Sequence, residues 1–257
     1  MTVAAGKNDW ATVAALGLMA TCVVTFDHEA LGHGGACLLL HGRIRLLTSS
    51  LFRCDIKSGW IDAAGPASNL LMGAFALACR RLIPQRMVKL GLFLLLVTAF
   101  SWFWEAGYVM RAMLRRDGDL YFFAQFLLGD VTVWERWTAA AAGFALYAAT
   151  YRITSAGLSG LWPQAPAARA AARTVWVSAT VGAAIAALAY PGPDWPNVRD
   201  AVLEISGASF PLLLMPLRGS REGTPTSAAV ARSPGAMLLA GAVYALFVAT
   251  QGHGLVS

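Results

Sequence analysis

The sequence predicts an all-α polytopic membrane protein with about six to eight transmembrane helices. Of the 257 residues, 57% are hydrophobic and only 13% are charged, and the mean hydropathy is +0.57. Soluble domains usually carry about 25% charged residues, so this composition lies well outside their range. The apolar residues are gathered into runs separated by short polar loops, which indicates a multi-pass integral protein of the cell membrane.

The first apolar run covers residues 10–40. It is longer than the roughly 20 residues that a span requires, so we expect a tilted or broken helix. No basic cluster or small-residue cleavage site marks a removable signal peptide, so this helix is expected to act as its own insertion signal. The polar stretch 41–60 follows, with a β-prone piece at 44–48, and predicts a re-entrant hairpin whose backbone is buried in protein or faces water.

Further helices are expected in the downstream apolar runs at 70–79, 88–113, 121–133, 137–151, 174–190, 202–217 and 237–250. Residues 161–173, where Pro163 and Pro166 lie, are predicted to form a loop or an interfacial segment, and a polar loop is predicted at 218–234. We expect the first of these segments to separate a membrane-embedded core, residues 1–155, from additional C-terminal transmembrane helices in residues 156–257.

The formal net charge of +6 does not indicate a nucleic-acid partner. Basic residues are scattered through the short loops and do not form a single patch, which argues against nucleic-acid binding. The lipid bilayer is the expected environment instead. By the positive-inside rule, the densest basic group marks the cytoplasmic side of the membrane: Arg80, Arg81, Arg86 and Lys89.

The four cysteines are Cys22, Cys37, Cys54 and Cys79. Their spacing shows no pairs, and three of them lie in or beside apolar runs. We therefore interpret them as small core residues, and not as disulfide partners or metal ligands.

Two histidines and two acids interrupt the first apolar run, in the segment Asp27-His28-Glu29-Ala30-Leu31-Gly32-His33. Ionisable side chains are costly inside a membrane, so a helix that contains them usually uses them. Positions five apart lie about 140° apart around a regular helix, so the two imidazoles would not face one ion. A π-type bulge would bring them into register, and the glycines at 32, 34 and 35 make that deformation inexpensive.

We therefore expect a metal site in which neutral His28 and His33 bind Zn²⁺. Glu29 would lie beside the open position, where it takes a proton from the zinc-activated water and later passes it to a leaving amine. The alternatives are an interhelical pair of hydrogen-bonded histidines, or ligands of a haem or structural metal. His41 is a further possible ligand, but a solvated loop position suits it better.

A second motif, Gly65-Pro66-Ala67-Ser68-Asn69, precedes the apolar run at 70–79. A proline followed by an asparagine predicts a kinked or newly started helix with a polar amide inside the membrane. Asn69 offers both a donor and an acceptor, so it could hold the main chain of an extended peptide. An interhelical hydrogen bond is the alternative role for Asn69.

Together the two motifs resemble those of the site-2 protease family of intramembrane zinc metallopeptidases. The segment 28–33 is similar to that family's His-Glu-Leu-Gly-His signature with one residue added, and 64–69 is similar to its Gly-Pro-x-x-Asn motif. The longer six-residue form resembles that of soluble peptidases similar to dipeptidyl peptidase III. The resemblance covers about residues 10–150. It implies that the core hydrolyses peptide bonds of membrane proteins or peptides within or near the bilayer.

The family's later Leu-Asp-Gly motif, which supplies the third zinc ligand, is absent from this sequence. A catalytic zinc needs three protein ligands and one open position. Asp119 is our first choice, because it follows a glycine and opens an apolar segment, so that it can enter at a helix start and point inward. Asp130 is the alternative third ligand, and a helix cap is the other role for Asp119. Glu105 and Asp117 are further acids in this part of the chain, and Glu105 is interpreted as marking the membrane interface.

Two other classes of function use the same polar residues without proteolysis. One is a pseudoprotease scaffold that binds membrane partners, and the other is an ion or proton transporter with His28, Glu29 and His33 as a relay. Stoichiometric zinc that is lost when both histidines are changed would favour the protease. Membrane di-iron hydroxylases are excluded, because they need many more histidines than the 4 present.

Overall fold

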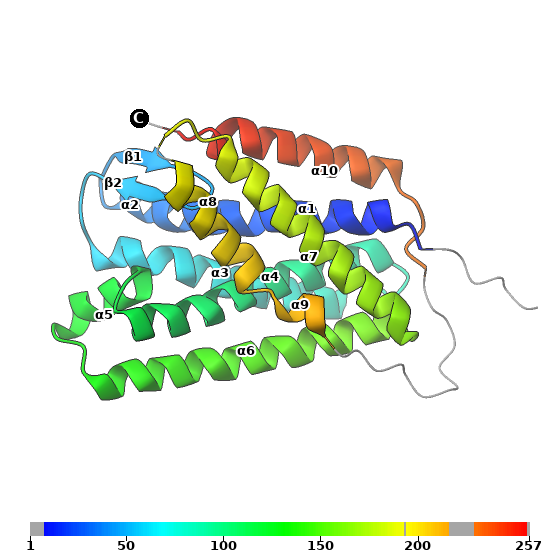
Figure 1. Cartoon of the computed structure of the whole chain (residues 1–257), viewed down its shortest axis with the longest axis horizontal. Helices are drawn as coiled ribbons and strands as arrows, with labels where there is room; N and C mark the ends of the chain where they lie inside the picture. Colours follow the sequence, from blue (N-terminus) through cyan, green and yellow to red (C-terminus); the bar gives the residue numbers. More distant parts are fainter. Residues whose placement is uncertain (1–7, 193, 216–228, 256–257) are drawn as a thin grey trace, which may run out of the picture.

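The computed structural model describes residues 8–192, 194–215 and 229–255. This part of the chain is almost wholly helical, which confirms the predicted all-α class, and its only sheet is a two-stranded hairpin. Figure 1 shows the long helices lying beside one another, with the hairpin and α5 at one end of the bundle. The elements in chain order are α1 (Trp10–Phe26), η1 (Asp27–Gly34), α2 (Gly35–Leu39), β1 (Ile44–Leu47), β2 (Phe52–Cys54), α3 (Gly59–Leu82), α4 (Val88–Arg115), α5 (Asp119–Leu128), α6 (Val133–Leu161), α7 (Ala165–Leu188), α8 (Asp194–Val202), η2 (Leu203–Gly207), α9 (Pro211–Leu214), α10 (Pro234–Phe247) and η3 (Val248–Gly252).

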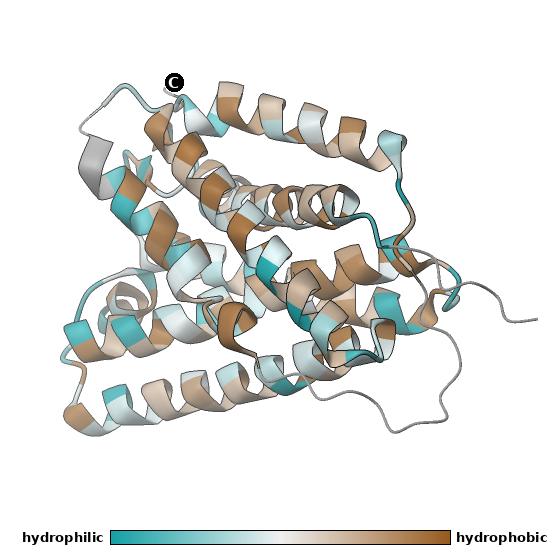
Figure 2. Cartoon of the chain, turned by 45° about the vertical axis from the view of Figure 1, so that its right-hand side comes forward, coloured by the Kyte–Doolittle hydropathy of each residue, from teal (hydrophilic) through white to brown (hydrophobic). Residues whose placement is uncertain are grey.

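Four helical segments of the described chain are long and apolar enough to cross a membrane. They are Trp10–Leu39, which joins α1, η1 and α2, then α4 and α7, and Pro234–Gly252, which joins α10 and η3. Large apolar side chains such as Phe75, Phe144 and Leu238 are exposed on the outside of the bundle. Figure 2 shows hydrophobic residues along the outer helices. An apolar surface of this extent suits contact with lipid, as expected of a membrane protein.

Helix α4 packs against α1, α3 and α6 and supplies much of the hydrophobic core. Leu92, Leu95, Phe100 and Phe103 of α4 are buried, and Val175 of α7 belongs to the same core. Side chains from both sides of the predicted boundary at 155/156 therefore pack together. The division into a core and additional C-terminal helices stays a prediction.

The predicted loop at 161–173 is wrong, because helices occupy most of it. α6 continues to Leu161 and α7 begins at Ala165. Pro166 fits in the first turn of α7, where its missing N–H costs no helical hydrogen bond. The alanines that follow are strong helix formers, so two prolines do not make a long loop.

Helix α3 also begins earlier than the Gly-Pro motif indicates. Ser58 caps the helix, its Oγ accepting a hydrogen bond from the Trp60 N–H at 3.3 Å, and Pro66 lies in the interior. Of the two alternatives predicted for this motif, a newly started helix is therefore wrong. A local cap and tertiary packing outweigh the loss of one hydrogen bond at proline.

The apolar run at 202–217 does not form one long helix. Its described part is divided between the end of α8, η2 and the short α9. The run at 237–250 lies within α10 and η3, as predicted. The loop predicted at 218–234 lies mostly outside the described residues.

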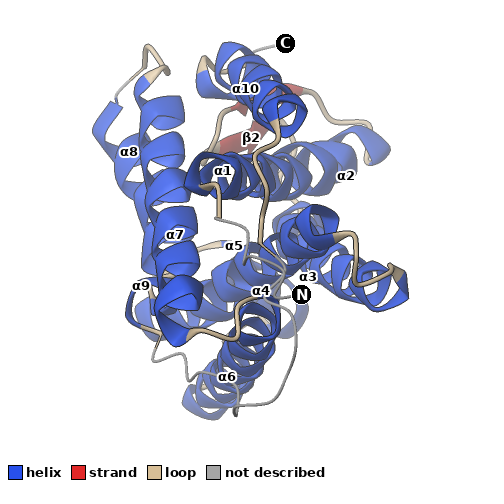
Figure 3. Ribbon diagram, turned by 90° about the vertical axis from the view of Figure 1, so that its right-hand side faces the viewer, coloured by secondary structure: helices blue, strands red, loops and turns tan. Residues whose placement is uncertain are grey.

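A hairpin is present in the predicted stretch, with β1 and β2 paired antiparallel, and its re-entrant character stays a prediction. The hydroxyl groups of Thr48 and Ser50 donate to Oδ1 of Asn197 in α8, at 3.0 and 2.8 Å. The backbones of Leu47 and Leu255 exchange two hydrogen bonds. In Figure 3 the strands lie between α1 and α10, at the far end of the bundle. These contacts hold the hairpin against the protein, as a polar backbone near a membrane requires.

A disulfide joins Cys37 of α2 to Cys54 of β2, so the prediction that no cysteine pairs is wrong. The two residues are 17 positions apart, a spacing that carries no recognisable signal by itself. The hairpin turns the chain back and brings Cys54 beside α2. Cys22 and Cys79 are free, as expected.

We expect two of the four cysteines to resist alkylation in denaturant until a reductant is added, as measured by intact mass. Changing Cys37 to serine should lower the thermal stability, because a cross-link around a loop of this size is worth roughly 3 kcal/mol. Cys79→Ser is the matched control and should leave the melting temperature nearly unchanged. Alkylation of all four cysteines without reductant would contradict the disulfide.

Candidate metal centre

The two histidines lie on a π-helical segment, as the sequence predicts. α1 continues into η1, whose wider turns accommodate the five-residue spacing of His28 and His33. This segment packs closely on α3: a Cβ atom on Gly32 would lie 2.6 Å from Gly65 Cα, and one on Gly65 would overlap the His33 ring. Gly32 therefore permits the close approach of η1 to α3, and Gly65 leaves the space that the His33 imidazole occupies.

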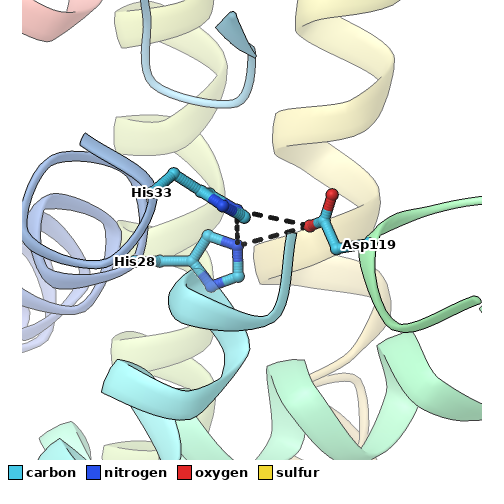
Figure 4. A group of neighbouring side chains, drawn as sticks. All are labelled: His28, His33 and Asp119. Carbon is cyan, nitrogen blue, oxygen red and sulfur yellow. Dashed lines mark hydrogen bonds and ion pairs between the residues drawn. The ribbon is translucent and has the colours of Figure 1, made fainter. Parts of the chain in front are cut away.

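His28, His33 and Asp119 form a group of potential metal ligands whose donor atoms all lie within 4.8 Å of one another. The His33 Nε2 atom lies 3.1 Å from His28 Nε2 and 3.3 Å from Asp119 Oδ2, and His28 Nε2 lies 3.9 Å from the same oxygen. Zinc with bonds of about 2.0–2.1 Å in a tetrahedral site places its donors roughly 3.3 Å apart. The triangle in Figure 4 therefore fits one face of a zinc coordination sphere.

The hydrogen bonds of the two imidazoles leave their Nε2 atoms available as ligands. His33 Nδ1 lies 2.7 Å from the carbonyl oxygen of Ile61, which can only accept, so Nδ1 carries the proton. His28 Nδ1 lies 2.9 Å from Glu105 Oε1 and donates to it in the same way. Both neutral rings then direct unprotonated Nε2 atoms at each other and at Asp119, as metal-ligating histidines do.

Asp119 is the first residue of α5, and Tyr108 of α4 fixes its position. The Tyr108 hydroxyl donates to Asp119 Oδ2 at 3.2 Å and accepts from the Asp119 N–H at 3.1 Å. Gly118 precedes it with φ +96°, and a Cβ atom there would lie 2.7 Å from the Tyr108 hydroxyl. Burial acts to raise the pKa of the Asp119 carboxyl, but protonated imidazoles beside it outweigh this effect and hold its pKa below the ordinary value. A positive charge between the two rings and Asp119 therefore stabilises the ionised carboxylate, whether that charge is a proton or a metal ion.

Glu105 is a member of this site that the sequence interpretation missed. It is 2% exposed inside α4, so the prediction that it marks the membrane interface is wrong. Its Oε1 atom accepts from His28 Nδ1 and from the Asn69 amide, the latter at 2.8 Å. The available signal was an acid far inside an apolar 28-residue helix, which is by itself an indication of function.

Asn69 lies fully buried behind His28, and its amide donates to Glu105. This contact joins α3 to α4, in agreement with the interhelical alternative considered for Asn69. It also supports the carboxylate that orients the His28 ring. A direct contact between Asn69 and a substrate stays a prediction.

An aromatic ring stacks on the face of each imidazole. The Trp104 ring stacks on His28 with centroids 4.5 Å apart and an interplanar angle of 15°. Phe52 of β2 stacks on His33 with centroids 5.5 Å apart at 17°. The hairpin and α4 therefore restrict the tilt of the two rings, which keeps the Nε2 atoms convergent.

Glu29 lines the same cavity as the three ligands. This cavity has a volume of about 240 Å³ and is bordered by His28, His33, Asp119 and residues of the hairpin, including Ser50. Glu29 is buried, and its Oε2 atom has no hydrogen-bond partner among the described residues. A buried carboxylate oxygen that is free to accept a proton beside a ligand set is suited to act as a general base.

The other candidates do not join the group of three ligands. Asp130 is exposed beyond the end of α5, whose length separates it from Asp119. Asp117 borders the cavity without joining the ligand group. His41 is exposed in the turn after α2, as expected of a solvated loop histidine.

No family model, curated protein or solved structure matches this chain. The function therefore has to be inferred from the site and from the membrane-type fold. The resemblance to site-2 proteases stays an expectation based on two short motifs.

The ligand set predicts the zinc content of four variants. His28→Ala, His33→Ala and Asp119→Ala should each lose zinc, because a catalytic site needs all three protein ligands. Asp130→Ala is the matched control and should keep one zinc per chain, as measured by elemental analysis of purified protein. Full zinc in Asp119→Ala would remove Asp119 from the site, and loss of zinc in Asp130→Ala would make that residue the third ligand.

Glu105 should strengthen zinc binding through His28 without touching the metal. Glu105→Leu removes the acceptor for His28 Nδ1–H, so we expect zinc affinity to fall about 10- to 100-fold. Glu105→Gln keeps an acceptor oxygen and should restore part of that loss. Competition with a chelator measures both affinities, and an unchanged affinity in Glu105→Leu would show that the carboxylate does not position the ring.

Proposed function

We propose that this chain is an intramembrane zinc metalloendopeptidase, similar in site chemistry to site-2 proteases. The observation that carries the proposal is the convergence of His28 Nε2, His33 Nε2 and an Asp119 oxygen beside Glu29, whose Oε2 atom has no hydrogen-bond partner in the described part of the chain. The cavity that contains them lies in a bundle with four helical segments suited to a membrane. Its substrates are membrane proteins or membrane-associated peptides.

Two further helices would bring the number of long helical spans to six, and the passage from α8 to α9 carries the chain back across the bundle between α7 and α10. α3 has 24 residues and α6 has 29, and at about 1.5 Å per residue both exceed the thickness of the hydrocarbon core. Figure 1 supports this assignment, since both lie alongside the four apolar segments. The protein would then be a multi-pass component of the cell membrane.

The metal site is expected on the side of the membrane opposite the cytoplasm. The Cys37–Cys54 disulfide lies beside the hairpin, and disulfides persist in oxidising compartments. The basic group at Arg80 to Lys89 connects α3 to α4 at the other end of the bundle, which the positive-inside rule assigns to the cytoplasm.

The residues of the site have distinct roles in this proposal. His28, His33 and Asp119 would hold the zinc ion, which supplies a Lewis acid for the scissile carbonyl and lowers the pKa of water. Glu29 accepts the proton of the attacking water and passes it to the leaving amine. Glu105 orients His28, and Tyr108 orients Asp119. A helical substrate must unwind locally so that its carbonyl can reach this site.

A proton or ion relay is the second candidate. A buried chain of polar contacts from Asn69 through Glu105 and His28 to His33 favours it, because such chains conduct protons in membrane transporters. Metal content separates the two functions. A relay needs no zinc, whereas the peptidase binds one zinc ion that disappears when both histidines are replaced.

Glu29→Gln should abolish proteolysis while keeping the fold and the zinc. Glutamine fills the same space but cannot accept the proton, and loss of a general base costs typically 10²- to 10⁴-fold in rate. Purified full-length protein with a membrane-anchored test substrate measures the turnover, and Asp130→Asn serves as the control. Undiminished cleavage by Glu29→Gln would refute the proposed role of Glu29.

A further inference from the structure

A second cavity adjoins the metal cavity. It has a volume of about 300 Å³, and its walls come from α4, α6, η2 and the residue after η2. Tyr108, Arg111 and Glu204 border both cavities. The two spaces therefore share part of their lining beside the metal ligands.

The walls of the second cavity are mainly apolar. They include Trp104, Gly107, Met110, Tyr147, Leu203 and Ala208. The Tyr147 hydroxyl donates to the Ala208 carbonyl at 2.7 Å and so presents its ring, rather than a free polar group, to this space. The polar groups of the cavity lie where it meets the metal cavity, as in ligand sites that bind apolar groups.

Two observations indicate that this cavity belongs to the metal site. The Trp104 ring, which lines this cavity, also stacks on the ligand His28. The cavity and the ligand therefore contact the same indole ring. One wall is formed by η2, a π-helical segment, and such segments are frequent at functional sites. Figure 4 shows the ribbon coloured as α8 and η2 passing beside the three ligands.

We propose that this cavity is a specificity pocket for one large apolar side chain, such as leucine, methionine or phenylalanine, next to the scissile bond of the substrate. The inference rests on the proposed peptidase function. Ligand pockets usually measure roughly 300–1,000 Å³, so a cavity at the lower limit suits one side chain rather than a whole peptide. A lipid acyl chain has the same apolar chemistry, and the test below distinguishes the two.

Gly207→Leu tests the pocket by filling it. Among the described residues, a Cβ atom on Gly207 meets only Leu203 Cδ2, at the ordinary contact distance of 3.6 Å, so the fold can accept a side chain there. The matched control is Gly241→Leu in α10, where a Cβ atom has no neighbour within 4 Å among the described residues. Neither residue belongs to the ligand set or its hydrogen-bond partners.

We expect Gly207→Leu to lower kcat/KM at least about tenfold for a substrate with leucine beside the scissile bond, and less than about threefold for an otherwise identical substrate with alanine at that position. Gly241→Leu should leave both values unchanged, and zinc content should be equal in all three proteins. Equal effects of Gly207→Leu on the two substrates would overturn the pocket. Absence of cleavage by the unaltered protein would instead refute the proposed function.

A binding measurement that needs no turnover completes the test. In the Glu29→Gln protein, a substrate peptide with photo-leucine beside the scissile bond should crosslink to Leu203, Ala208 or Tyr147, and Gly207→Leu should suppress this product. Crosslinks confined to other helices would overturn the proposal. Labelling of these residues by a lipid with a photoreactive acyl chain, but not by the peptide, would assign the cavity to lipid and also overturn it.

Discussion

Two imidazole Nε2 atoms held 3.1 Å apart, with a carboxylate oxygen 3.3 Å from one of them, are the feature on which this site depends. Both rings donate through Nδ1, to Glu105 and to the Ile61 carbonyl, so neutral rings present lone pairs to each other. Such lone pairs repel unless a proton or a cation lies between them. A divalent metal ion satisfies both nitrogens and the Asp119 carboxylate together, which a shared proton does not.

The fold assembles this arrangement from four separate helical elements, and each contributes a different constraint. η1 supplies the two histidines, α3 leaves room for one of them at Gly65, α4 carries Glu105 and Tyr108, and α5 begins at Asp119. Burying so many ionisable groups in a membrane protein is costly unless they pair or bind a cation. The arrangement is therefore difficult to explain as a purely structural core.

The local sequence was sufficient to predict those features of the site whose physical cause is local. The five-residue spacing of His28 and His33 requires a wider helical turn, and the adjacent glycines permit it, so the π-helix could be predicted. Asp119 could be chosen because a residue at a helix start can point inward. The contact of Glu105 with His28 joins residues 77 positions apart, and the Cys37–Cys54 bond depends on the hairpin. Such pairings follow from tertiary packing, which no local pattern encodes.

The most direct test of the metal centre is X-ray absorption at the zinc edge, recorded on the purified full-length protein. The arrangement of His28, His33 and Asp119 predicts one zinc ion with two imidazoles and the remaining ligands oxygen, at about 2.0–2.1 Å. Sulfur ligands, more than two imidazoles, or the absence of stoichiometric zinc after purification with added metal would contradict a zinc site formed by these three residues.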